Sequence, residues 1–178
     1  KQLVAALDSD NLFWRQTAQR LLVEGNDKNA IPALRKRALG QDAGAVHALW
    51  TLEGLGALDA ETKRTTLIST DPAVKRNAVR ALGQAKADEQ LLYDSATLAD
   101  ADLHVRLAAF VKLAQFPESK THQRAATVLS QDKTNAEDEW LKLALSAAGA
   151  DQSAIVGYER GSNLLANASF EKAAGNLP

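Results

Sequence analysis

The amino-acid sequence predicts an all-α protein, an α-solenoid of about five antiparallel helix pairs that ends in an irregular C-terminal tail. Two observations lead to this prediction. A segment centred on alanine recurs at steps of 30 or 31 residues, and once more after 35. Hydrophobic residues make up 46% of the 178 residues, but aromatic residues only 5%. Small aliphatic side chains suit closely packed helices, and this period is typical of stacked helix pairs.

Each copy of the recurring segment has an anchor residue, usually apolar, and an alanine four residues later. Most copies also have a leucine eight residues after the anchor. At about 100° per residue these offsets fall on one face of an α-helix, so each copy is predicted to be helical. The copies occupy residues 14–22, 44–52, 74–82, 105–113 and 140–148, and their central alanines are Ala18, Ala48, Ala78, Ala109 and Ala144.

Start signals precede several copies. Asn11, Asp71 and Asp102 each lie three residues before an anchor, where an N-cap side chain accepts a hydrogen bond from the first turn. Pro72 then occupies the first helical position, which tolerates proline. The acidic residues 137–139 precede the fifth copy, and the helix macrodipole favours negative charge there.

A first helix is expected before each copy, separated from it by a turn that contains aspartate. Pro32 is compatible with such a helix because first-turn amides have no intrahelical acceptor. The expected first helices cover residues 2–7, 30–39, 60–69, 89–99 and 119–130. Residues 1–150 are therefore expected to form one helical-repeat domain.

This pattern resembles HEAT repeats, particularly their short form in bilin lyases and many bacterial proteins. The D-x-x-V-[RK] segments at residues 71–75 and 102–106 carry the resemblance most plainly. In that family the turn aspartate and the helix Arg or Lys form a ladder between neighbouring repeats. The resemblance therefore implies structural roles for Lys75 and Arg106. It also implies an interrupted ladder at Gly44 and Ala45, which replace the Val-Arg pair.

The second helices of HEAT pairs line the concave side of the stack, and offsets +2 and +6 from the anchor point away from the core. Trp50 is therefore expected to be exposed, between Arg20 and Arg80. The predicted protein-binding row comprises Trp50, Arg20, Arg80, Arg76 and Val46. An exposed aromatic ring is a favourable binding anchor. The alternative is that Trp50 packs within the molecule, against a further domain or a repeat boundary.

Other conspicuous residues have structural interpretations. Trp14 and Trp140 occupy anchor positions and are expected in the core or at the ends of the stack. His47, His104 and His122 show no metal-ligand spacing, so they are expected to be structural or solvated. Gly54-x-Gly56 follows a helix and lacks the rest of a dinucleotide-binding motif, which favours a helix-ending role. His47 and both glycines lie within residues 47–56, and the other two histidines are at positions 104 and 122.

The sequence predicts no catalytic, cofactor-binding or metal-binding residue, and the chain is expected not to be an enzyme. It has no cysteine, and no nucleophile–base or carboxylate pair stands out. The net charge of −1 provides no field to attract nucleic acid. No segment approaches the roughly 20 apolar residues that span a bilayer, so no membrane insertion is expected.

The tail has a different character. Residues 163–171 and 177–178 resemble the opening of carbohydrate-binding-like β-sandwich modules, which begin N-L-L-x-N-x-S-F-E. The resemblance implies that residues 151–178 form a linker and the first strand of a truncated β-sandwich domain. Carbohydrate would then be a partner only through that missing module.

The segments at 14–22, 27–35 and 47–59 also resemble the helical-repeat part of PVC-type haem-binding, membrane-bound dehydrogenase-like proteins. In those exported proteins a sugar-dehydrogenase-like β-propeller precedes the repeats and a c-type haem domain follows them. The resemblance implies a multidomain bacterial parent and a periplasmic or secreted location. It transfers no catalytic residue to this chain.

Three functions remain open from the sequence. The first is a non-catalytic scaffold that binds a protein partner or a flanking domain of its parent chain on its concave face. The second is a docking segment of a sugar-dehydrogenase-like, c-type haem oxidoreductase. The third is a bilin-lyase-type enzyme, which would require an acid or histidine cluster that the sequence does not display.

Overall fold

The computed structural model describes residues 2–117 and 119–150. Of these residues, 72% are helical and none lies in a strand, which confirms the predicted all-α class. The α-helices are α1 (Gln2–Ala6), α2 (Leu12–Glu24), α3 (Ile31–Ala38), α4 (Ala43–Gly54), α5 (Ala60–Leu67), α6 (Pro72–Arg80), α7 (Lys86–Asp94), α8 (Leu103–Leu113), α9 (Lys120–Ser130), α10 (Lys133–Glu137) and α11 (Glu139–Ala147). The predicted linker and strand over 151–178 lie outside the described residues.

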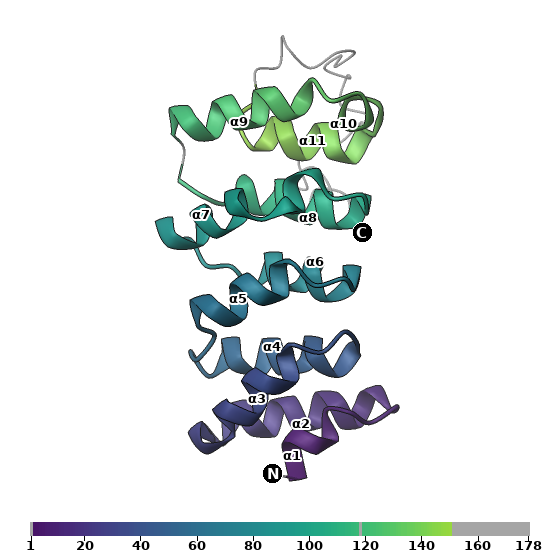
Figure 1. The fold of residues 1–178 in the computed structure, drawn as a ribbon, viewed down its shortest axis with the longest axis vertical. Coiled ribbons are helices and arrows are strands. Elements are labelled where there is room, and N and C mark those ends of the chain that lie inside the picture. The colour runs from purple at the N-terminus through teal and green to yellow at the C-terminus, as the bar shows by residue number, and fades with distance from the viewer. Residues whose placement is uncertain (1, 118, 151–178) are drawn as a thin grey trace, which may run out of the picture.

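The helices stack in a column, with α1 and α2 at one end and α9, α10 and α11 at the other (Figure 1). One layer is continuous: α2 packs on α4, α4 on α6, α6 on α8, and α8 on α11. The helices α1, α3, α5, α7 and α9 pack respectively on α2, α4, α6, α8 and α11. Within this second layer, α5 also contacts α3 and α7. Each helix therefore packs mainly against its neighbours in the column.

Aspartate and asparagine side chains start most of these helices. Asn11 accepts a hydrogen bond from the backbone N–H of Phe13, and Asp71 accepts one from Val74, each at 2.9 Å. Asp102 accepts from two backbone N–H groups of the first turn of α8. These contacts satisfy amides that have no intrahelical acceptor. All three predicted N-caps are thus confirmed, and further caps are Asp42, Asp59, Ser119, Asp132 and Asp138.

The structure departs from the expected first helix over residues 89–99. The helix α7 begins earlier and ends at Asp94, and the 3-10 helix Ala96–Ala99 follows it. Ser95 separates the two because its backbone is extended, with ψ 155°, and its side chain accepts a hydrogen bond from Thr97. Serine commonly ends a helix by bonding nearby backbone groups in this way. The short helix α10 is also unexpected, in a segment predicted to be a turn.

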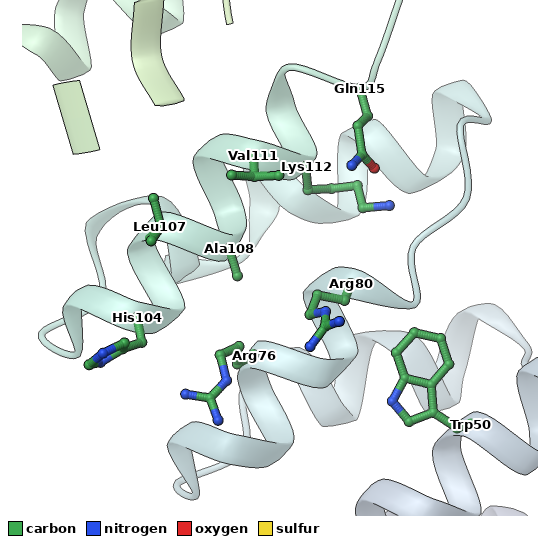
Figure 2. A pocket seen from close by; sticks show the side chains of 9 residues that line it. All are labelled: Trp50, Arg76, Arg80, His104, Leu107, Ala108, Val111, Lys112 and Gln115. Atoms are coloured by element: carbon green, nitrogen blue, oxygen red, sulfur yellow. The ribbon is translucent and has the colours of Figure 1, made fainter. Parts of the chain in front are cut away.

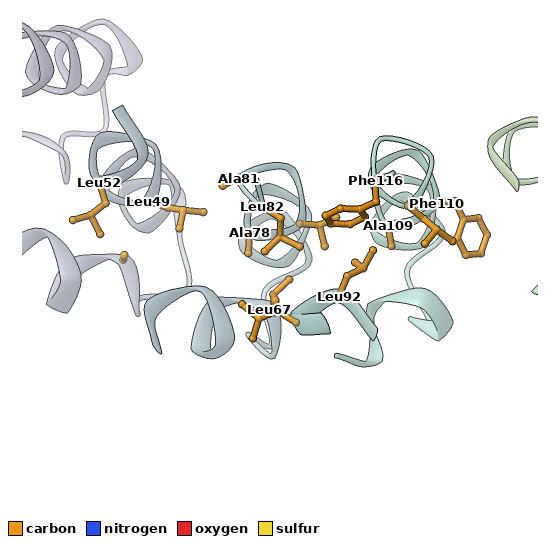
Figure 3. Packing of buried hydrophobic residues seen from close by; sticks show 14 of the residues in the cluster. Leu49, Leu52, Leu67, Ala78, Ala81, Leu82, Leu92, Ala109, Phe110 and Phe116 are labelled. Atoms are coloured by element: carbon orange, nitrogen blue, oxygen red, sulfur yellow. The ribbon is translucent and has the colours of Figure 1, made fainter. Parts of the chain in front are cut away.

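The core follows the predicted frame. The central alanines Ala18, Ala48, Ala78, Ala109 and Ala144 are all 7% exposed or less. Leucines eight residues after the anchor are buried with them, and Figure 3 shows Leu52, Leu82 and neighbouring side chains packed between the two layers. Alanine at the central position lets the backbones of adjacent helices approach closely, while leucine fills the space between the layers.

Of the two places expected for Trp14 and Trp140, the core is wrong, and both residues lie on helices at the ends of the column, α2 and α11. Trp14 is 56% exposed and Trp140 is 68% exposed. Among the described residues, α2 and α11 are the first and last helices of the continuous layer, so each has a neighbour in that layer on one side only. Trp14 instead contacts the exposed ring of Phe13, with ring centroids 5.2 Å apart. In α11 the adjacent Leu141, 1% exposed, takes the buried place.

Candidate functional site

The helices α4, α6 and α8 together form a groove of about 510 Å³ on one side of the column. It is called the Trp50 groove here. Its lining residues are Trp50, Arg76, Arg80, His104, Leu107, Ala108, Val111, Lys112 and Gln115. In Figure 2 the two arginines of α6 lie between Trp50 on α4 and the apolar side chains of α8.

Trp50 is half-buried, which corrects the expectation of an exposed ring. The ring packs against the hydrophobic core, and its Nε1–H donates a hydrogen bond of 2.9 Å to Oδ1 of Asn77 on α6. The Asn77 amide donates in turn to the carbonyl oxygen of Ala73, at 2.8 Å. Because its polar N–H is already bonded, Trp50 offers carbon surface to the groove.

Arg76 and Arg80 lie one helical turn apart on α6. Within residues 2–117 and 119–150, neither guanidinium has a hydrogen bond or an ion pair. No carboxylate lines the described part of the groove. Like charges at this spacing repel each other. The groove is therefore a positively charged site with unused hydrogen-bond donors.

The third side of the groove is formed by α8. Leu107, Ala108 and Val111 supply apolar surface, and Val111 is 45% exposed. Lys112 is only 8% exposed, and its Nζ donates a 2.7 Å hydrogen bond to the carbonyl oxygen of Leu82. Burial is the main cause that lowers the pKa of Lys112. This contact joins α8 to the end of α6, where helix carbonyls lack intrahelical partners.

Three of the five predicted binding residues meet in the groove. They are Trp50, Arg76 and Arg80. Arg20 is exposed and instead forms an ion pair of 3.1 Å with Glu24 on its own helix. Val46 is half-buried in α4 and does not line the groove. The residues of the predicted protein-binding row that line the groove therefore all belong to α4 and α6.

Sequence reasoning missed Lys112, although a signal was available. Lys112 lies seven residues after the anchor Val105, and this offset points toward the core. A lysine at an inward position indicates a buried cation that needs an acceptor. The other missed residues, His104, Ala108 and Gln115, carry no pattern that distinguishes them from ordinary surface residues.

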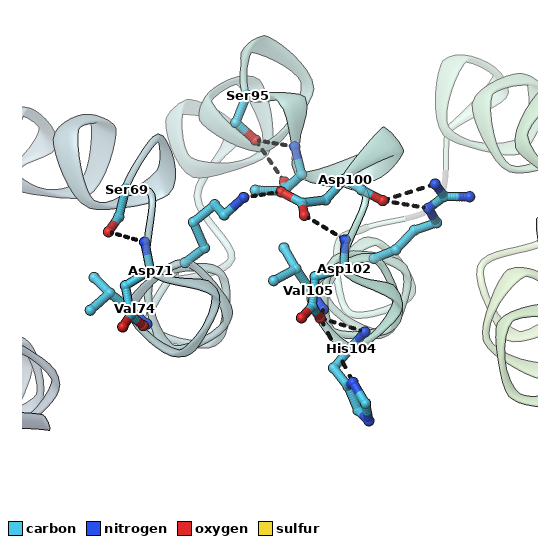
Figure 4. Close-up of polar contacts among 11 residues, drawn as sticks. Ser69, Asp71, Val74, Ser95, Asp100, Asp102, His104 and Val105 are labelled. Carbon is cyan, nitrogen blue, oxygen red and sulfur yellow. Dashed lines mark hydrogen bonds and ion pairs between the residues drawn. The ribbon is translucent and has the colours of Figure 1, made fainter. Parts of the chain in front are cut away.

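A second set of charges connects neighbouring helix pairs (Figure 4). The Nζ of Lys75 on α6 forms an ion pair with Asp100, before α8. Arg106 on α8 donates to the backbone oxygen of Asp100 at 2.8 and 3.0 Å and to Oδ1 of Asn135 at 2.8 Å. Lys75 and Arg106 therefore have structural contacts, as their predicted roles require.

This ladder changes at the second copy, where the sequence has Gly44 and Ala45. No cation extends from α4 at that position. Arg37 from α3 fills the place and pairs with Asp8 and Asp42. A Cβ added at Gly44 would lie 2.2 Å from Nη2 of Arg37. Because Gly44 has no side chain, the guanidinium of Arg37, which belongs to the other layer of helices, fits beside it.

The histidines and glycines do not form a second site. Nδ1 of His47 lies 2.7 Å from Oε1 of Gln19, while His122 is buried and His104 is exposed at the groove. Burial, with a contribution from Arg15, lowers the pKa of His47. Gly56 has φ +63° just after α4, which confirms the helix-ending role. Among the described residues, no cluster of three His, Asp or Glu could hold a metal ion.

Comparison with models of known protein families finds no match for this chain. Comparison with curated protein sequences finds none either. In the described residues, no helix is both long and apolar enough to cross a membrane. The described residues are all-helical or in turns and loops, and the Trp50 groove is their candidate functional site.

Proposed function

We propose that this chain is a non-catalytic interaction module: a HEAT-like α-solenoid of about five antiparallel helix pairs in a larger exported bacterial protein. It binds a protein partner, or a flanking domain of its parent chain, on the concave face formed by its second helices. The Trp50 groove is the binding site on that face.

The pattern of helix contacts supports the solenoid. Each second helix packs on the next one along the column, and each first helix packs on its own partner. Such an arrangement buries helix faces only against near neighbours and leaves an extended surface for binding. The ladder of Lys75, Asp100 and Arg106 connects successive pairs in the way that the HEAT resemblance implies.

The observation that carries the binding function is the composition of the groove. It combines the carbon surface of Trp50 with two arginines that have no partner among the described residues. Tryptophan and arginine are the residue types that most often dominate binding energy at protein interfaces. A groove of about 510 Å³ is large enough to receive side chains of a partner.

Site-specific cross-linking tests this function. The photoreactive residue p-benzoylphenylalanine replaces Val111 in the groove or, as control, Val128, which is 66% exposed on α9 in the other layer. Irradiation in the source cells, followed by mass spectrometry, should map adducts from position 111 to one peptide of a partner protein or of a flanking domain. Equal adducts from both positions, or none from position 111, would contradict the proposal.

A further inference from the structure

We infer that the Trp50 groove receives an acidic segment of its protein partner, which presents carboxylates to the two arginines and an apolar side chain beside them. This inference rests on the proposed binding function and specifies the chemistry of the partner. It depends on the charges of α6, on the apolar surface of α4 and α8, and on the absence of acidic side chains from the described lining.

The charges are the first argument. Several other cations in the described part of the chain have carboxylate partners: Arg37 has Asp8 and Asp42, and Lys63 has Asp88. Arg76 and Arg80 have none among the described residues, although they repel each other one turn apart. Carboxylates would relieve this repulsion, and guanidinium groups bind carboxylates through paired hydrogen bonds.

The apolar surface is the second argument. Figure 2 shows Arg76 and Arg80 flanked by Trp50 on one side and by Leu107 and Val111 on the other. Trp50 contributes only carbon surface because its N–H is bonded to Asn77. An occupant therefore needs carboxylates above α6 and an apolar group against α4 or α8.

These features favour a peptide over a nucleic acid. Proteins that hold nucleic acid present several cations along the phosphate backbone. Here Lys112 is buried and already bonded to Leu82, so two arginines remain for the ligand, together with exposed His104. The net charge of the chain is −1. A short acidic segment matches this small, mixed surface.

Selection from a display library of random short peptides, with the whole chain as the target, tests the inference. Enriched peptides should combine Asp or Glu residues with a nearby apolar residue, and added salt should weaken their binding. Arg76→Glu and Arg80→Glu should each reduce affinity about tenfold or more. Arg124→Glu is the matched control, since Arg124 is exposed on α9 and unpaired among the described residues; it should leave affinity unchanged.

The other outcomes separate the two proposals. If the enriched peptides are neutral or basic and their binding is lost in Val111→Asp, the inference of an acidic partner segment is overturned. The groove is then still supported as a binding site. If no enriched peptide depends on a groove residue, both proposals fail. A further outcome is that the chain binds polythymidine as tightly as the peptides and loses that binding in Arg76→Glu. This result would overturn the inferred peptide ligand in favour of a nucleic acid. Urea unfolding of each variant confirms that it folds.

Discussion

Asp100 is only 8% exposed, yet its carboxylate has a lowered pKa. Burial by itself would raise that pKa, but hydrogen bonds from Lys75 and from the backbone N–H of Asp102, together with the charges of Lys75 and Arg106, outweigh it. Breaking a buried pair leaves one charge without compensation, which costs more than the pair contributes by forming. The stability of the connection between α6 and α8 therefore depends on the ionised form of Asp100.

Asp100→Asn is expected to lower the free energy of unfolding at neutral pH by about 2 kcal/mol. Because the folded pKa is below the unfolded value, the contribution of Asp100 is present above the unfolded pKa and is lost as pH falls through the folded pKa. The variant should therefore lose less stability than the original chain on acidification. Urea titrations at several pH values measure both effects. Asp10→Asn, at an exposed position, should change neither.

At the scale of helices, Trp50 has two roles that the sequence presents as alternatives. Its ring lines the groove and also packs against the core, and its hydrogen bond to Asn77 joins α4 to α6. The bond determines the orientation of the ring, so the shape of the groove depends on the contact between the two helices. Trp50 is thus a structural residue and a candidate binding residue at once.

A double-mutant cycle of Trp50→Phe and Asn77→Ala isolates this bond. Phenylalanine keeps most of the packing but removes the donor, and we expect a coupling free energy of about 1 kcal/mol from urea unfolding. The distant pair of Trp50→Phe and Ser119→Ala should be additive to within about 0.5 kcal/mol. Additive effects of the Trp50 and Asn77 substitutions would show that the bond does not connect the helices.

At the scale of the whole molecule, the column arrangement limits how far a local change spreads. Ala78 on α6 is 1% exposed, and α6 packs on α4, α5 and α8. It has no comparable contact with α2 or α11, at opposite ends of the column (Figure 1). In an architecture with mainly nearest-neighbour contacts, stability is approximately a sum of local terms.

Ala78→Leu should destabilise the chain by about 1–3 kcal/mol because extra volume at this position forces the backbones apart. Hydrogen exchange should accelerate most in α4, α6 and α8 and least in α11, since local opening follows local contacts. Ala73→Leu, at an exposed position of the same helix, should have little effect. Uniform acceleration in every helix would indicate one cooperative unit instead of a stack with local coupling.

The repeat predicted the helices well because its evidence is local. The central alanines and the caps Asn11, Asp71 and Asp102 lie where the helical period and capping chemistry require them. Errors arose where a neighbour decided the outcome. The same anchor position is buried at Val74 but exposed at Trp14, because α6 packs between α4 and α8 whereas α2 lies at the end of the column.

The candidate site was predictable only in part, because some of its properties depend on neighbouring helices. Helical phase placed Trp50, Arg76 and Arg80 on one face, and the structure brings them together in the groove. Arg20 pairs with Glu24, four residues later on the same helix, a helical spacing that favours an ion pair and that the predicted row did not take into account. Arg76 and Arg80 have no carboxylate at such a spacing, and the sequence does not show whether another helix supplies one.

The sequence by itself determined the all-α class, the helical period and most of the helix starts, because hydrophobic spacing and N-caps act within a few residues along the chain. Only the tertiary structure decided which cations remain without partners and how far Trp50 is buried. Both properties depend on contacts between residues about 25–30 positions apart, such as those of Trp50 with Asn77 and of Lys75 with Asp100. Such contacts exist only once the helices have packed.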